Sequence, residues 1–149
     1  MDDLLAVENL SVEFRVQAGL VRAGTDVTGY GLLGHLGSMC RASDVGAEIE
    51  ISKVPLIDAK VRRLIEEDCI PGGTRENLNA AERFTEFQGV NESDRYLVAD
   101  AQTSGGMLLC VEERKLADVM KILKKLRTPA TAIVGRIVKS AKPQIWVKN

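Results

Sequence analysis

Paired cysteines, clustered histidines and long apolar runs are all missing from this chain of 149 residues. Its three cysteines, Cys40, Cys69 and Cys110, lie far apart and form no C-x-x-C motif, and their odd number argues against a disulfide framework. With a single histidine, His35, the chain also lacks the usual ligands of a zinc site. We therefore expect a reducing compartment, and any bound metal should be a hard cation held by oxygen ligands.

An excess of charge of either sign is lacking as well. The sequence has 20 basic and 21 acidic residues, for a net charge of -1, whereas a nucleic-acid surface needs clustered positive charge. Lys121, Lys124, Lys125 and Arg127 do cluster, but at the spacing of a solvated helix face. No basic and then apolar leader opens the sequence, and no run of about 18 apolar residues occurs. We expect a cytoplasmic protein that binds neither nucleic acid nor membrane.

Length and hydrophobic periodicity predict one α+β domain. A chain of this length can bury about two-thirds of its unfolded surface in one core, so residues 1–149 are expected to form a single domain. The opening stretch 4–23 fits a helix or a strand, and the polar stretch 86–95 is typical of a loop. Because helices and strands mix without strict alternation, we expect a mixed β-sheet layered with α-helices. The patterns predict helices near 32–42, 57–65, 74–84 and 116–126, and strands at 47–52, 96–99, 107–111, 132–138 and 145–148.

A glycine pattern at positions 29–34, GYGLLG, matches the dinucleotide-binding motif G-x-G-x-x-G. That fold needs an apolar strand leading directly into the first glycine, but here the polar stretch RAGTDVT precedes it. Asp26, three residues before Gly29, would also point a carboxylate at the pyrophosphate. Glu48, nineteen residues after Gly29, stands where a ribose-binding acid would stand, so the dinucleotide site remains an alternative.

The same residues also fit a metal-bridged phosphate site. Asp26 could hold Mg²⁺, which prefers carboxylate and phosphate oxygens, while Thr28 and the amides after Gly29 open a helix whose positive end attracts anions. Spacing alone favours a simpler interpretation, in which Asp26 or Thr28 caps that helix. In that case Gly31 and Gly34 would only permit close packing.

Two further polar loops are candidates for anion binding. In DAQTSGG, positions 100–106, the two glycines that follow Thr-Ser can point several N–H groups into one concavity, although a tight turn before the next strand is the simpler interpretation. In PGGTRENLN, positions 71–79, the first residues predict a turn and Thr74 is placed to cap the next helix. The same interpretation applies to Asn77, as a cap or turn former.

Taken together, the three segments TDVTGYGLLGH, PGGTRENLN and DAQTSGGMLL resemble, in this order and spacing, the C-terminal half of the selenophosphate synthetase (selenide, water dikinase) family. The family pattern reads TDVTGFGLLGH, PGGTxxN and DPQTSGGLL, so this chain departs from it at Tyr30, Ala101 and Met107. Losing the proline at position 101 should loosen the start of the third segment. The resemblance extends from about Asn9 to Val138, and by analogy it makes the opening stretch a helix.

The resemblance implies both a fold and an activity. Family members transfer the γ-phosphoryl group of ATP to selenide, giving selenophosphate, AMP and orthophosphate, and they use Mg²⁺ and K⁺. The implied fold is the C-terminal domain shared with aminoimidazole ribonucleotide synthetase. The family's N-terminal half, with its glycine-rich segment, reactive cysteine or selenocysteine, catalytic lysine and further aspartates, has no counterpart here. We expect the chain to be inactive alone, to need that half as its partner, and to belong to a homodimeric enzyme.

By resemblance, Asp26 is the metal ligand that this half contributes, and Thr25 and Thr28 beside it contact phosphate. His35 is at least as well explained by a structural role as by a catalytic one. A non-catalytic nucleotide- or protein-binding module of the same fold is the alternative, and hydrogenase-maturation and thiamine-phosphate kinases share the fold. The resemblance places six further residues at or near the interdomain cleft: Asn77, Gln102, Thr103, Ser104, Gly105 and Gly106.

Overall fold

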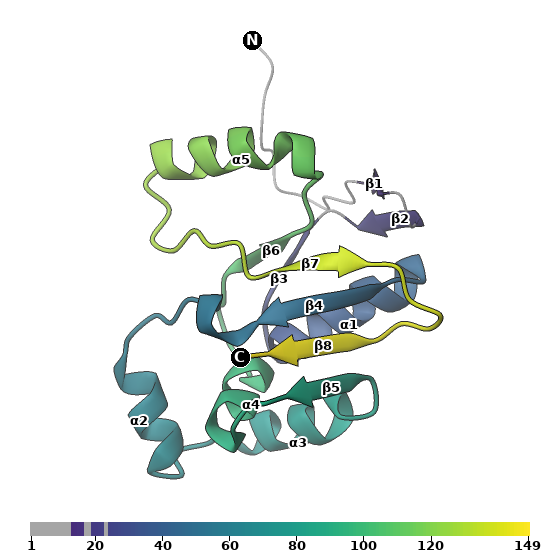
Figure 1. Cartoon of the computed structure of the whole chain (residues 1–149). Helices are drawn as coiled ribbons and strands as arrows, with labels where there is room; N and C mark the ends of the chain where they lie inside the picture. Colours follow the sequence, from purple (N-terminus) through teal and green to yellow (C-terminus); the bar gives the residue numbers. More distant parts are fainter. Residues whose placement is uncertain (1–12, 17–18, 23) are drawn as a thin grey trace.

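The structure is a computed structural model that describes residues 13–16, 19–22 and 24–149. A four-stranded mixed sheet lies at its centre (Figure 1). Its strand order is β5-β8-β4-β7. The central pair β4–β8 and the pair β5–β8 are parallel, while β4 and β7 are antiparallel. The bounds of these strands are β4 Gly46–Glu50, β5 Thr85–Gln88, β7 Gly135–Val138 and β8 Ile145–Lys148.

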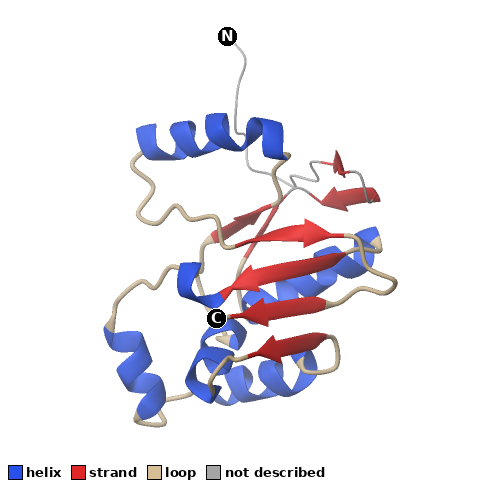
Figure 2. Cartoon of the chain, in the orientation of Figure 1, coloured by secondary structure: helices blue, strands red, loops and turns tan. Residues whose placement is uncertain are grey.

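Three helices cover one face of this sheet and pack against one another, as Figure 2 shows. They are α1 (Gly31–Ser43), α3 (Gly72–Ala81) and α4 (Glu92–Ala99). The shorter α2 (Lys60–Glu66) packs on α4. Helix α5 (Glu113–Lys125) lies beyond β7, and none of its residues is buried. Among the described residues, no helix combines the length and apolarity that crossing a membrane requires.

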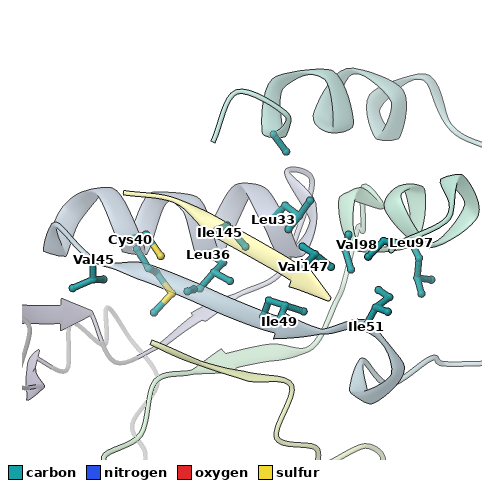
Figure 3. Close-up of a cluster of buried hydrophobic side chains, with 14 residues drawn as sticks. Leu33, Leu36, Cys40, Val45, Ile49, Ile51, Leu97, Val98, Ile145 and Val147 are labelled. Carbon is teal, nitrogen blue, oxygen red and sulfur yellow. The ribbon is translucent and has the colours of Figure 1, made fainter. Parts of the chain in front are cut away.

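The core lies between the sheet and these helices (Figure 3). In β8, Ile145 and Val147 are fully buried, while Trp146 and Lys148, which alternate with them, turn to the opposite, more exposed face. Leu33 and Leu36 of α1 and Val98 of α4 meet these strands from the helical side. Burial of one face of the sheet and exposure of the other therefore follow from the alternation of the sequence.

Two small antiparallel ribbons complete the fold. Strand β3 (Gly24–Asp26) pairs with β6 (Met107–Leu109), and this ribbon leads directly into α1 and out of the DAQTSGG segment. Strand β1 (Glu13–Val16) pairs with β2 (Gly19–Arg22), which packs on α1. A 3₁₀ turn, Ile51–Lys53, follows β4.

The predicted α+β class, with a mixed sheet and layered helices, is confirmed, as are most of the predicted elements. The stretch 86–95 is not a loop, because it contains β5 and the start of α4. Residues 96–99 form the end of α4 and not a strand. The helix inferred by analogy for the opening is also wrong in its described part, which is β1 and β2, whereas Asn9 lies outside the described residues.

Candidate functional site

The turn between β3 and α1 carries the first candidate residues. Asp26 ends β3, and the next amide, that of Val27, donates to the oxygen of Gly106 at 2.8 Å, which continues the ribbon by one more bond. The Asp26 carboxylate is exposed and makes no hydrogen bond or ion pair with the described residues. Thr25, whose hydroxyl donates to the Asp26 backbone oxygen at 3.1 Å, lies beside it. A carboxylate held by a strand but left without a partner is available to a cation.

Thr28 joins this turn to two other parts of the chain. Its carbonyl oxygen accepts from the Gly31 amide at 3.0 Å and from the Gln102 amide at 3.1 Å. Its own amide donates to Nε2 of His35 at 3.1 Å. Helix α1 begins after Tyr30 without any side-chain cap. The interpretation of Asp26 or Thr28 as the cap, which spacing alone favoured, is therefore wrong.

Helix α3 fastens the β3–α1 turn to the start of the DAQTSGG segment. The side-chain amide of Asn77 donates to the oxygens of Gly29, at 2.8 Å, and Ala99, at 3.1 Å. Asn77 lies within α3, and both of its bonds go to backbone oxygens of other segments. Through the Asn77 side chain, the PGGTRENLN segment thus contacts both the TDVTGYGLLGH segment and the residue that precedes DAQTSGG.

Thr74 makes the second connection from α3. Its hydroxyl donates to Oδ1 of Asp100 at 3.1 Å and accepts from the Ala101 amide at 3.0 Å. Thr74 is buried inside the helix, whose N-cap is Pro71, so the predicted capping role of Thr74 is wrong. Partial burial raises the pKa of the Asp100 carboxyl, and the hydrogen bond from Thr74 opposes that shift.

Two glycines permit these segments to approach one another. Gly31 has φ +66°, and a β-carbon there would lie 2.6 Å from the backbone of Ala99. A β-carbon on Gly105 would lie 2.1 Å from the Val27 oxygen and 2.3 Å from Oε1 of Gln102. Side chains at these two positions would force the turn and the loop apart.

The rest of the DAQTSGG segment is open to solvent. Thr103, Ser104 and Gly106 are exposed, and Gln102 and Gly105 are half-buried. The hydroxyls of Thr103 and Ser104 make no hydrogen bond with the described residues. Because Gly106 is bonded to Val27, the end of this loop adjoins the Asp26 turn.

The dinucleotide alternative does not fit this geometry. The strand before the glycines belongs to an antiparallel ribbon and not to a parallel βαβ sheet. Glu48, which would bind the ribose, is instead paired on the sheet with Arg136, at 2.7 Å, and Lys148, at 3.1 Å. These hydrogen bonds lower the pKa of the Glu48 carboxyl.

The donor set fits only part of a magnesium site. No group of three or more histidine, cysteine, aspartate or glutamate side chains that could hold a metal occurs in the described part of the chain. Mg²⁺ is commonly bound through one or two protein carboxylates together with substrate phosphates and water. Asp26 can act as such a ligand, provided that phosphate or another domain completes the coordination.

Sequence reasoning gave Asp100 no role and left that of His35 open, although both lie within the segments that it singled out. Their contacts, Thr74 to Asp100 and Thr28 to His35, are side-chain hydrogen bonds. The His35 contact spans seven residues, from the turn to the second helical turn of α1, so it could be proposed from spacing. The Asp100 contact spans 26 residues and could not.

Comparison with known proteins agrees with the resemblance drawn from the three sequence segments. Residues 2–148 match the model of the AIR synthase related protein, C-terminal domain. A selenide, water dikinase of Myxococcus xanthus (strain DK1622) is 41% identical over 128 residues, which cover 85% of this chain and 36% of the relative. The enzyme of the same name from Carboxydothermus hydrogenoformans (strain ATCC BAA-161 / DSM 6008 / Z-2901) is 35% identical over 150 residues, 100% of this chain and 42% of the relative. The chain therefore spans well under half the length of these relatives.

A solved structure shows the same fold. The thiamine-monophosphate kinase from Stenotrophomonas maltophilia K279a aligns with a TM-score of 0.50 at 16% sequence identity. The alignment covers 84% of this chain and 31% of that one. At this identity the likeness concerns the fold alone.

Proposed function

Because the chain belongs to the AIR synthase related proteins, as their C-terminal domain, we propose that it forms one side of a phosphotransferase site. The enzyme would make selenophosphate from selenide, ATP and water, with AMP and orthophosphate as the other products. The observation that carries the proposal is the joining of three polar segments by Asn77, Thr74 and Thr28. This joining leaves one unpaired carboxylate and one exposed Thr-Ser-Gly-Gly loop next to each other.

In this proposal Asp26 would hold Mg²⁺, and the ion would supply charge neutralisation at the phosphates of ATP. Asp26 suits that role because it sits at a strand end, is exposed and has no competing partner among the described residues. Phosphoryl transfer depends mostly on positioning and charge stabilisation. Strand β3 sets the position of the Asp26 backbone, and the hydrogen bonds of the following turn to His35, Asn77 and Gln102 hold that turn in place.

Phosphate contacts would come from the turn and the loop. Thr25 and Thr28 flank Asp26, and the partly exposed segment 102–106 can turn amides and hydroxyls toward an anion. The side-chain amide of Asn77 already donates hydrogen bonds to the backbone oxygens of Gly29 and Ala99. Its contribution would therefore be to support the phosphate-binding segments.

The chemistry that this chain lacks would come from the N-terminal half of the enzyme. The matched segment makes up 36% of the Myxococcus xanthus relative and 42% of the Carboxydothermus hydrogenoformans relative, so more than half of each lies outside it. The reactive cysteine or selenocysteine and the catalytic lysine would lie there, and the isolated chain would be inactive. From the resemblance we also propose that the enzyme is a homodimer and uses K⁺ as a second cation. From the cysteine usage we propose that it works in the cytoplasm.

The experiment is to fuse this chain to the part of the Myxococcus xanthus relative that lies outside the matched segment. Phosphorus NMR of ATP and selenide should show selenophosphate and AMP with the fusion and neither with the chain alone. Robust turnover by the isolated chain would overturn the division of roles. A folded fusion that binds ATP but yields no selenophosphate would favour the non-catalytic module of the same fold.

A further inference from the structure

His35, the one histidine of the sequence, is not part of the hydrophobic core cluster. It lies on α1, is half-buried and turns back toward the β3–α1 turn, with its ring centroid 5.9 Å from that of Tyr30. Nε2 lies 3.1 Å from both the amide nitrogen and Oγ1 of Thr28. The amide nitrogen and the hydroxyl oxygen of Thr28 therefore both contact the same ring nitrogen of His35.

The direction of these bonds follows from the amide. A backbone N–H can only donate, so Nε2 must carry its lone pair and the ring proton must be on Nδ1. The Thr28 hydroxyl, facing the same lone pair, can then only donate to it as well. Its proton is directed at His35, and its oxygen lone pairs are directed elsewhere.

We propose that His35 is a positioning residue that holds the Thr28 amide and orients the Thr28 hydroxyl, so that the hydroxyl oxygen serves as a ligand for a hard cation beside Asp26. Hydroxyl and carboxylate oxygens are both suitable ligands for such ions. The Thr28 amide donates to His35 and is unavailable to phosphate, so any phosphate contact of Thr28 must come from the same hydroxyl that would hold the cation. The contacts of His35 Nε2 with Thr28 are observed in the structure. The role of the Thr28 hydroxyl as a cation ligand rests on the proposed function.

Thr28 is held on its other side as well. Its carbonyl oxygen accepts from Gly31 and from Gln102. With the amide tied to α1 and the carbonyl tied to α1 and the loop, the direction of the Thr28 side chain is set by His35. Residues that orient a metal ligand through a hydrogen bond commonly change metal affinity by about tenfold or more when they are replaced.

The hydrogen bond can be observed in the unaltered chain. Nitrogen-15 NMR should show a scalar coupling between the Thr28 amide nitrogen and Nε2, and a single histidine makes the assignment unambiguous. In His35→Leu, exchange of the Thr28 amide proton should be about tenfold faster. His35→Gln retains an acceptor oxygen and should restore slow exchange. Ser38→Ala, an exposed change on the same helix, is the control.

The cation role is tested in the fusion with the Myxococcus xanthus part, where the other domain can complete the coordination, by adding Mn²⁺ and following the paramagnetic broadening of the amides around Asp26. We expect the dissociation constant to rise about tenfold in Thr28→Val and His35→Leu, and to stay near the original value in His35→Gln and Ser38→Ala. No coupling, together with unchanged Thr28 exchange in His35→Leu, would overturn the positioning role. Equal Mn²⁺ affinity in the unaltered fusion and its Thr28→Val variant would overturn the ligand role. Absence of broadening in the unaltered fusion would contradict the Asp26 site itself, while the scalar coupling between Thr28 and His35 still decides the role of His35.

Discussion

The side-chain amide of Asn77 donates to the backbone oxygen of Gly29 at 2.8 Å, across 48 residues of sequence. The same nitrogen also donates to Ala99 at 3.1 Å. One side chain of α3 thus holds both the turn that follows Asp26 and the end of α4 that leads into the loop. The contact therefore couples the position of the turn to that of the end of α4.

Replacing Asn77 by alanine should therefore loosen the site and destabilise the fold. Two backbone oxygens lose their donor, and we expect a loss of about 1–2 kcal/mol in the free energy of unfolding, measured by urea titration. Asn79→Ala is the matched control, because Asn79 lies exposed on the same helix, and its effect should stay within about 0.5 kcal/mol. Equal effects of the two variants would mean that the Asn77 bonds contribute nothing.

The two glycines of the DAQTSGG segment should respond differently to alanine. In Gly105→Ala the new methyl group would lie 2.1 Å from the Val27 backbone oxygen, whereas at Gly106 nothing lies within 4 Å. We expect Gly105→Ala to cost about 1–3 kcal/mol and Gly106→Ala to stay within about 0.5 kcal/mol, both by urea unfolding. A stable Gly105→Ala protein with unchanged amide shifts at Val27 would contradict the close approach of the loop.

Much of the fold could be predicted from the sequence, because apolar periodicity is strong in α1 and α5. Helix α4 was missed because its apolar run, 97–99, is short enough to fit a strand, and because its cap lies in a polar stretch. There Asn91 accepts from the Asp94 amide at 2.9 Å. Strand β5 has no recognisable pattern of its own, and it forms because β8 offers a partner.

The candidate site was predicted in its segments but not in its contacts. Order and spacing of three polar motifs identify the segments, and the family match agrees with them. The bonds from Asn77 to Gly29 and from Thr74 to Asp100 depend on how α3 packs against α1 and α4. Such contacts between distant residues follow from tertiary packing, which no local pattern specifies.

Stability should depend on pH through Glu48. Hydrogen bonds from Lys148 and Arg136 lower its pKa in the folded chain, so this carboxylate stabilises the fold above about pH 4.3, the ordinary value for glutamate. That contribution is lost as the pH falls through the lowered pKa. The urea midpoint of the original chain should fall more between pH 7 and pH 3 than that of Glu48→Gln.

Because Glu48 is partly exposed, the effect should be small and should shrink in high salt. Glu76→Gln is the control, since Glu76 is exposed on α3 and makes no ion pair with the described residues. Parallel pH profiles for the original chain and Glu48→Gln would show that the two cation contacts do not stabilise the fold.

Replacing Asp26 separates the metal role from a structural one. Asp26→Asn keeps the size of the side chain, and because the carboxylate has no partner among the described residues, stability should change by no more than about 0.5 kcal/mol. In the fused enzyme, selenophosphate formation measured by phosphorus NMR should fall about a hundredfold, since a charge that stabilises the transferring phosphoryl group is lost. A helix cap would behave in the opposite way, with Asp26→Ala losing about 1 kcal/mol of stability and keeping its turnover. Since α1 begins without a side-chain cap, Asp26→Ala should instead be as stable as Asp26→Asn and as inactive. Near-normal turnover in either variant would remove Asp26 from the metal site.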